Sequence, residues 1–157
     1  MAQQKPDSVR HYNNAVYLEL GGPALVYSVG YERIWYRNNW FSAISSAGFS
    51  FIPDGIQIGY VEPGVLFRDK NLAFEIGVAL VSYKENPHNG SQFSTPDGSA
   101  KVLYLNARVG ARFFSKNQHF HYRIGLTPFM ELSNNEPLSR DNRPHLWLNV
   151  FTVGYRF

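Results

Sequence analysis

Apolar side chains fall on every second residue along most of this chain. In residues 71–84 one parity carries large apolar side chains, and the other carries small residues together with Glu75. A period of two is the spacing of a β-strand with two different faces, whereas an amphipathic helix repeats its apolar positions every three or four residues. No stretch has the helical spacing, so the pattern predicts an all-β protein.

Eight alternating segments can be drawn along the chain. Most have about ten to fourteen residues. The mean strand of a soluble protein has about five or six residues, whereas a tilted membrane strand needs about nine to eleven. The predicted strands are Asn14–Gly22, Leu25–Tyr36, Trp40–Ser50, Ile56–Phe67, Asn71–Lys84, Ala100–Phe114, His119–Leu132 and His145–Phe157.

Tight polar turns alternate with longer links between these segments. The tight turns are Arg37–Asn39, Arg68–Lys70 and Ser115–Gln118, and the longer links are Phe51–Gly55, Glu85–Ser99 and Ser133–Pro144. The first link, Gly22–Ala24, is short and interrupts the alternation. Short turns at one end and long loops at the other are typical of an antiparallel up-and-down barrel in an outer membrane. We therefore predict one eight-stranded transmembrane β-barrel domain over residues 1–157, with residues 1–13 as a periplasmic tail.

Two kinds of barrel satisfy this alternation. In a soluble lipocalin-like barrel the apolar face encloses a ligand, whereas in a membrane barrel it meets lipid and the other face fills the lumen. The non-apolar face is built of small residues, and the lysines lie only in the tail, in turns or at strand ends, at Lys5, Lys70, Lys84, Lys101 and Lys116. A sheet face in water would use lysine in mid-strand, so the membrane arrangement is favoured.

The mid-strand charges on the non-apolar face separate by sign along the chain. The glutamates come from the first half and the arginines from the second, at Glu19, Glu32, Glu62, Glu75, Arg108, Arg112, Arg123 and Arg156. Closing the sheet would bring the two halves together, and a guanidinium can bind a carboxylate through two parallel hydrogen bonds. Because an unpaired charge in a lumen is costly, we predict a Glu–Arg network that plugs the barrel.

Aromatic residues make up 16% of the chain and gather near the predicted connections. Rings of this kind favour the headgroup depth of a bilayer and form girdles on membrane barrels. Those beside the short turns are Trp35, Tyr36, Trp40, Phe41, Phe67, Phe113 and Phe120, and those near the long loops are Tyr83 and Trp147.

The remaining composition narrows the choice of partners. The absence of cysteine excludes disulfides and thiolate metal sites. A net charge of +3 without a basic run argues against nucleic acid as a partner. His119 and His121 are two residues apart beside a turn, a pattern that does not define a metal site. We interpret them as polar residues at the membrane boundary and predict no metal and no cofactor.

The chain ends in the sequence NVFTVGYRF, where Phe151, Val153, Tyr155 and Phe157 alternate with polar or small residues. An exposed apolar last strand is a template to which another strand can pair. This ending resembles the insertion signal that is read by the barrel-assembly machinery of Gram-negative outer membranes. The resemblance implies that this machinery is a partner during insertion.

The whole chain resembles the small eight-stranded barrels of Gram-negative outer membranes. The segments LELGGPALVYSVGYER and RIGLTPF are similar to an uncharacterised barrel group found in Bacteroidota-type genomes. The resemblance implies an integral outer-membrane protein whose signal peptide, absent from this sequence, has been removed. It implies no activity, so function has to be argued from the sites.

Three functions remain open on the sequence. We expect a monomeric, non-enzymatic barrel, closed to flow, with a structural role or a binding role for its long loops, where Arg140, Arg143 and His145 could meet lipopolysaccharide phosphates. The second is a lipid A-modifying enzyme that would use Ser139, Asp141 and His145. The third is a soluble lipocalin-like carrier of an apolar ligand.

Overall fold

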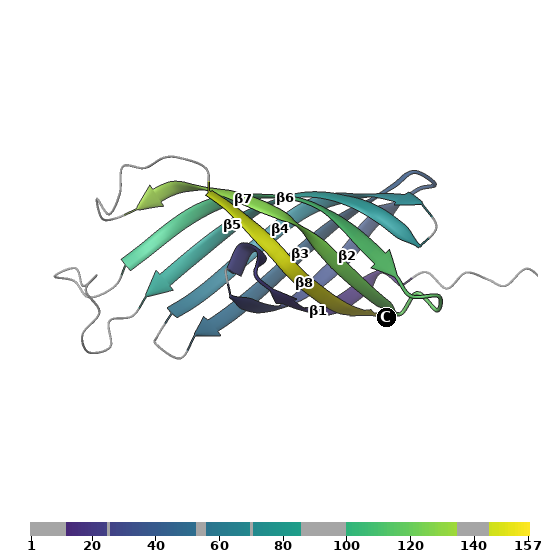
Figure 1. Cartoon of the computed structure of the whole chain (residues 1–157), viewed down its shortest axis with the longest axis horizontal. Helices are drawn as coiled ribbons and strands as arrows, with labels where there is room; N and C mark the ends of the chain where they lie inside the picture. The colour runs from purple at the N-terminus through teal and green to yellow at the C-terminus, as the bar shows by residue number, and fades with distance from the viewer. Residues whose placement is uncertain (1–11, 25, 53–55, 70, 86–99, 135–144) are drawn as a thin grey trace, which may run out of the picture.

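The computed structural model is a closed barrel in which every strand pairs with its sequence neighbours and β1 pairs with β8 (Figure 1). The structure describes residues 12–24, 26–52, 56–69, 71–85, 100–134 and 145–157. The strands are β1 Asn14–Leu20, β2 Tyr27–Arg37, β3 Phe41–Ile52, β4 Ile56–Asp69, β5 Leu72–Glu85, β6 Ala100–Phe114, β7 Phe120–Asn134 and β8 His145–Arg156. The predicted all-β, eight-stranded antiparallel barrel is therefore confirmed.

The three predicted tight turns join β2 to β3, β4 to β5 and β6 to β7 at one end of the barrel, on the right in Figure 1. In the first of them Asn38 Oδ1 accepts hydrogen bonds from the backbone N–H groups of Trp40 and Phe41, each at 2.8 Å. An asparagine that bonds to the backbone just after it stabilises a turn locally. We call this end the turn end and the opposite end the loop end.

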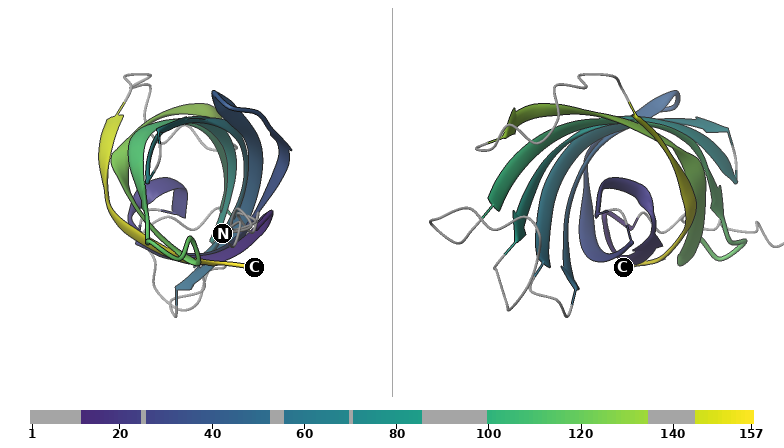
Figure 2. Two further views of the ribbon diagram at one scale, coloured as in Figure 1. Left: turned by 90° about the vertical axis from the view of Figure 1, so that its right-hand side faces the viewer. Right: turned by 60° about the vertical axis from the view of Figure 1, so that its left-hand side comes forward.

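The first hairpin differs from the prediction. Strand β1 stops at Leu20 and β2 starts at Tyr27, and between them Gly22–Ala24 form one turn of 3-10 helix, η1. This turn lies inside the barrel (Figure 2), where it touches β2, β3, β4, β5, β7 and β8. Gly21 and Gly22 have φ values of 78° and 72°, which glycine adopts without steric cost. The link that interrupts the alternation of turns and loops is thus folded into the lumen.

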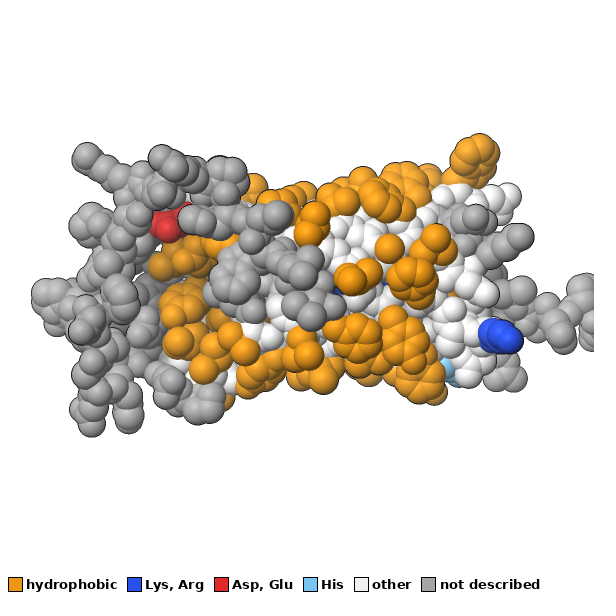
Figure 3. Space-filling view, in the orientation of Figure 1, with side chains coloured by type: hydrophobic (Ala, Val, Ile, Leu, Met, Phe, Trp, Pro, Cys, Tyr) orange, Lys and Arg blue, Asp and Glu red, His pale blue; other side chains and the backbone are white. Residues whose placement is uncertain are grey.

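The two faces of the strands have the orientation of a barrel with an apolar exterior. Leu72, Phe74 and Ile76 are 46%, 48% and 44% exposed, whereas Glu75 between them is 0% exposed. Figure 3 shows apolar side chains across the visible wall, with the charged side chains near its two ends. The lipocalin-like arrangement, in which these apolar side chains would enclose a ligand, is not the one that the chain adopts.

Large inward side chains pack over glycines of the neighbouring strand. Tyr17 is paired in register with Gly30, and Tyr60 is paired with Gly48. A Cβ atom at Gly30 would lie 2.3 Å from the Tyr17 ring, and one at Gly48 would lie 2.4 Å from the Tyr60 ring. The rings therefore occupy the space that any larger residue would need.

We expect Gly30→Ala to lower the free energy of unfolding by about 1–3 kcal/mol, because the added methyl group overpacks the lumen against Tyr17. Gly59→Ala is the matched control, since nothing lies within 4 Å of a Cβ built there, and we expect it to change stability by no more than about 0.5 kcal/mol. Denaturant unfolding of the two purified variants measures both values. Equal losses at the two glycines would contradict the packing argument.

Candidate functional site

The interior of the barrel is filled by a cluster of charged side chains from six strands. Each of the seven members is at most 2% exposed. Six ion pairs join them, and the members are Glu19, Glu32, Glu62, Glu75, Arg108, Arg112 and Arg123. We call this set the lumen network.

Arg108, on β6, binds two carboxylates from opposite parts of the wall. It donates from Nε to Glu62 Oε1 at 2.6 Å and from Nη2 to Glu62 Oε2 at 3.0 Å. It also donates from Nη1 and Nη2 to the two oxygens of Glu19, at 3.0 and 3.1 Å. Two bidentate pairs on one guanidinium use the planar geometry that arginine alone offers.

Arg112 and Arg123 extend the lumen network to the remaining glutamates. Arg112 donates to both oxygens of Glu32, at 2.5 and 2.7 Å, and to Glu75 Oε2 at 2.9 and 3.0 Å. Arg123 donates to Glu75 Oε1 at 2.9 Å and to Glu19 Oε2. Each arginine therefore bridges two carboxylates, and the network ties β1, β2, β4, β5, β6 and β7 together across the lumen.

The η1 turn lies directly against this network. A Cβ atom at Gly22 would lie 2.1 Å from Glu19 Oε1 and 3.6 Å from Arg108 Nη2. Thr152 supports the same carboxylate, since its hydroxyl donates to Glu19 Oε2 at 3.0 Å and accepts from Arg123 Nε at 3.3 Å. The network and η1 thus form one continuous filling of the barrel.

Tyrosine hydroxyls continue the polar filling beside the charges. The hydroxyl groups of Tyr17 and Tyr60 are 2.9 Å apart, and the Ser28 hydroxyl lies 3.1 Å from that of Tyr60. The guanidinium of Arg123 lies 5.1 Å from the centre of the Tyr17 ring, within the range of a cation–π contact. The sequence prediction placed these residues on the non-apolar face without assigning them a role.

Arg156, the eighth residue of the predicted network, lies inside the barrel at its turn end. It donates to the Tyr12 carbonyl at 3.0 Å and to Gln118 Oε1 at 3.4 Å, and its guanidinium lies 4.9 Å from the centre of the Phe114 ring. The Tyr12 hydroxyl is 3.0 Å from His119 Nε2. Arg156 and Tyr12 therefore close the turn end, a different position from that of the lumen network.

The two histidines do not share the boundary position that the sequence suggested. His119 precedes β7, is half-buried and stacks on Tyr155 with ring centres 5.5 Å apart. His121 instead points into the lumen, is fully buried and has no hydrogen bond to either ring nitrogen within the described residues. A Cβ atom at Gly154 would lie 2.1 Å from its ring. Strand parity could have placed His121 inside, since it shares the face of Arg123.

Arg33 is a charged strand residue that the sequence prediction left out. It is exposed on the outer face of β2, and its guanidinium lies 4.7 Å from the centre of the Trp35 ring. The parity of β2 assigned it to the outside, because Glu32 next to it points inward.

Several predicted site residues lie outside the described residues. These are the proposed lipopolysaccharide contacts Arg140 and Arg143 and the alternative catalytic residues Ser139 and Asp141; His145 begins β8, and its side chain is not among those described. The predicted insertion signal is described, and its side chains Phe151, Tyr155 and Phe157 are exposed on the outer face.

Within the described part of the chain, no group of three or more His, Cys, Asp or Glu residues could hold a metal ion. The same residues include no helix that is long and apolar enough to cross a membrane. No protein-family model, curated protein or solved structure matches the chain. Any functional assignment therefore has to rest on the geometry of the barrel.

Proposed function

We propose that the chain is an integral outer-membrane β-barrel with a closed lumen. In this proposal it has no catalytic role, and it stabilises the membrane or binds a partner through the loops at its loop end. The observation that carries the proposal is the distribution of polarity, with seven charged side chains buried at the axis and large apolar side chains exposed on the wall.

The outer face supports a bilayer as the surrounding medium. Soluble monomers seldom expose contiguous apolar patches larger than a few hundred Å², yet exposed apolar residues here recur along β1, β2, β4, β5, β6, β7 and β8. Strands β2 to β8 have 11 to 15 residues, enough to cross a hydrocarbon core when tilted. Both features fit a wall that faces lipid.

Aromatic side chains at the turn end support the same reading. Trp35, Tyr36, Trp40, Phe67 and Phe113 are all exposed there. Tryptophan and tyrosine favour the interface between headgroups and hydrocarbon, and a charged residue costs little near that depth. The exposed Arg33 beside Trp35 is consistent with such a position.

The filled interior supports a protein that does not conduct. Eight strands leave an interior just wide enough for side chains to fill, and here it holds the lumen network, the tyrosines and η1. Each network arginine already binds two carboxylates, so an ion would have to break paired charges to pass. A buried charge left without its partner is strongly unfavourable.

Reconstitution into lipid vesicles and planar bilayers tests both parts of the proposal. We expect the protein to float with the vesicles, to resist extraction by alkali, and to give no large steady current, while a porin prepared in parallel gives its usual conductance. Protein that stays in solution without lipid or detergent would contradict the membrane assignment. A large steady current from inserted protein would contradict the closed lumen alone.

The partners in this proposal are outer-membrane lipids and, during insertion, the barrel-assembly machinery. The outward side chains Phe151, Tyr155 and Phe157 support the second. Arg140, Arg143 and His145 remain the proposed contacts to lipopolysaccharide phosphates.

A further inference from the structure

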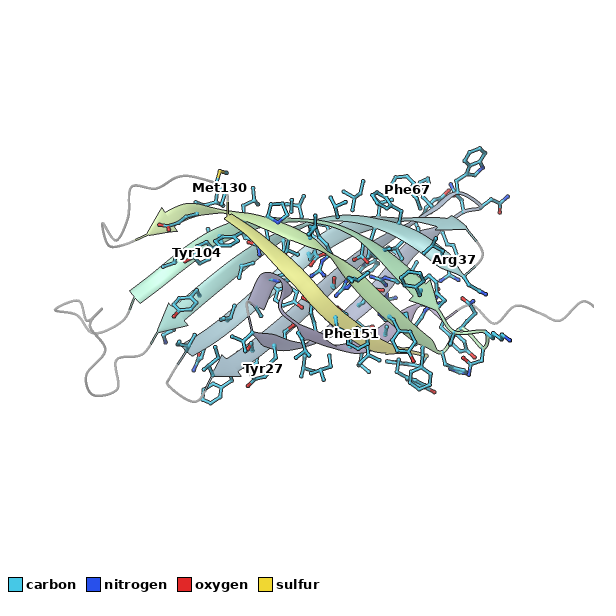
Figure 4. All side chains as sticks on the ribbon, viewed as in Figure 1. Tyr27, Arg37, Phe67, Tyr104, Met130 and Phe151 are labelled. Carbon is cyan, nitrogen blue, oxygen red and sulfur yellow. The ribbon has the colours of Figure 1, made fainter. Side chains whose placement is uncertain are left out.

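A second interior feature lies between η1 and the loop end of the barrel. It is a cavity of about 90 Å³ lined by Pro23, Ile58, Val81, Tyr83, Tyr104, Asn106 and Phe129. Pro23 belongs to η1, and the other residues come from β4, β5, β6 and β7. Figure 4 places Tyr104 toward the loop end, away from Arg37 at the turn end. We call this feature the loop-end pocket.

The pocket is apolar, unlike the network next to it. Ile58 and Val81 are buried and belong to a small apolar cluster with Ala24, Tyr60 and Ala79. The rings of Tyr104 and Phe129 meet edge to face, with centres 5.8 Å apart. Tyr83, Tyr104 and Phe129 are only half-buried, so the pocket has a buried floor and a more accessible aromatic rim. Tyr83, assigned by the sequence to the outer girdle, is part of this rim instead.

One polar side chain in the pocket has an unused acceptor. Asn106 is 3% exposed, and its Oδ1 atom has no hydrogen-bond partner within the described residues. A buried acceptor without a donor costs free energy and calls for an explanation. The neighbouring inward residue on β6, Arg108, has its donors directed to Glu19 and Glu62, so the network supplies an obvious donor elsewhere and not here.

We propose that the loop-end pocket binds a small apolar molecule that carries one hydroxyl or N–H donor. The apolar body would contact Ile58 and Val81, and the donor would bond to Asn106 Oδ1. An apolar cavity of about 150 Å³ accommodates benzene, so the ligand in a pocket of about 90 Å³ is no larger than a single six-membered ring. Phenol has this size and one donor, which makes it a suitable probe.

This proposal does not depend on the membrane assignment, because the pocket lies within the barrel in any medium. It also differs from a lipocalin-like calyx, since the ligand would occupy one end of a barrel whose remaining interior is filled by charges. Binding and membrane insertion can therefore succeed or fail separately.

The test is an NMR titration of the isotope-labelled, detergent-solubilised protein with phenol and, separately, with benzene. We expect phenol to cause saturable shifts of the Val81 methyl signals and of the Asn106 side-chain amide. We expect benzene to shift the Val81 signals with little change at the Asn106 amide. Shifts that rise linearly, or that spread over the outer wall as well, would indicate partition into the micelle and overturn the proposal.

Two substitutions divide the binding into its parts. Asn106→Leu is expected to lower the affinity for phenol relative to benzene by about 2- to 10-fold, the value of one net hydrogen bond. Val81→Phe fills the pocket and is expected to abolish saturable binding of both probes. Ser42→Ala, a buried lumen residue of β3 near the turn end, is the control and should bind like the wild type. An unchanged ratio in Asn106→Leu would overturn the role of Asn106, and a wild-type protein without saturable shifts would overturn the site whether or not the variants fold.

Discussion

Replacing Arg108 with methionine is expected to lower the free energy of unfolding by about 3–5 kcal/mol, the usual cost of breaking a buried ion pair from one side. Methionine keeps much of the side-chain volume, so the loss isolates the charge. Arg108 makes four hydrogen bonds to Glu19 and Glu62. Without it Glu62 keeps no ion-pair partner in the network, whereas Glu19 keeps Arg123.

Denaturant unfolding in detergent or lipid, followed by the shift between folded and unfolded bands on a gel, measures this loss. Arg33→Met is the matched control, because it removes the same side chain from the outer face, where only a contact with Trp35 is lost, and it should cost no more than about 1 kcal/mol. Adding Glu62→Gln to Arg108→Met should recover part of the loss, because it removes the stranded charge. An Arg108→Met variant as stable as Arg33→Met would mean that the network contributes little to the fold.

The faces of the strands could be predicted from the sequence because a barrel wall repeats with a period of two. Leu72, Phe74 and Ile76 had to lie on one side and Glu75 on the other. The sign of the charges further predicted that the two halves of the chain meet inside. Parity contains no information on height along the axis, however, and so Arg156 was grouped with the network although it lies at the turn end.

The pairing within the lumen could not be predicted for a related reason. Which carboxylate meets Arg108 depends on the stagger of the strands around the barrel, which is set by hydrogen-bond register and not by any one strand. The inward turn of Gly22–Ala24 was also missed, because a short Gly-Pro link has the composition of an ordinary surface turn. Its position became clear only when Gly22 was found against Glu19.

The loop-end pocket illustrates the limit of parity in another way. Tyr83 follows a strand whose small residues point inward, and its distance from the long link suggested a girdle position. Its parity is that of Glu75 and Val81, which already assigned it to the interior. The aromatic girdle was inferred from position along the strand, and only the combination of position and parity distinguishes a lipid-facing ring from one that lines a cavity.

Introducing arginine at Val78 is expected to lower the free energy of unfolding by about 2–4 kcal/mol, the cost of an arginine on the lipid face at the middle of a bilayer. Val78 lies near the centre of β5 and is exposed on the outer wall. In water the same change would be a surface substitution, worth no more than about 0.5 kcal/mol. The variant therefore separates a lipid environment from an aqueous one by a difference well above experimental error.

Leu72→Arg provides the internal control for depth. Leu72 is the first residue of the same strand, faces the same way and is equally exposed. It lies at the turn end, where an arginine can reach the headgroups, and it should cost only about 0–1 kcal/mol. Unfolding of both variants in lipid vesicles gives the comparison. A clear excess for Val78→Arg over Leu72→Arg requires a medium whose polarity changes along the barrel axis, whereas equal small effects would mean that the whole wall faces water and that the membrane assignment is wrong.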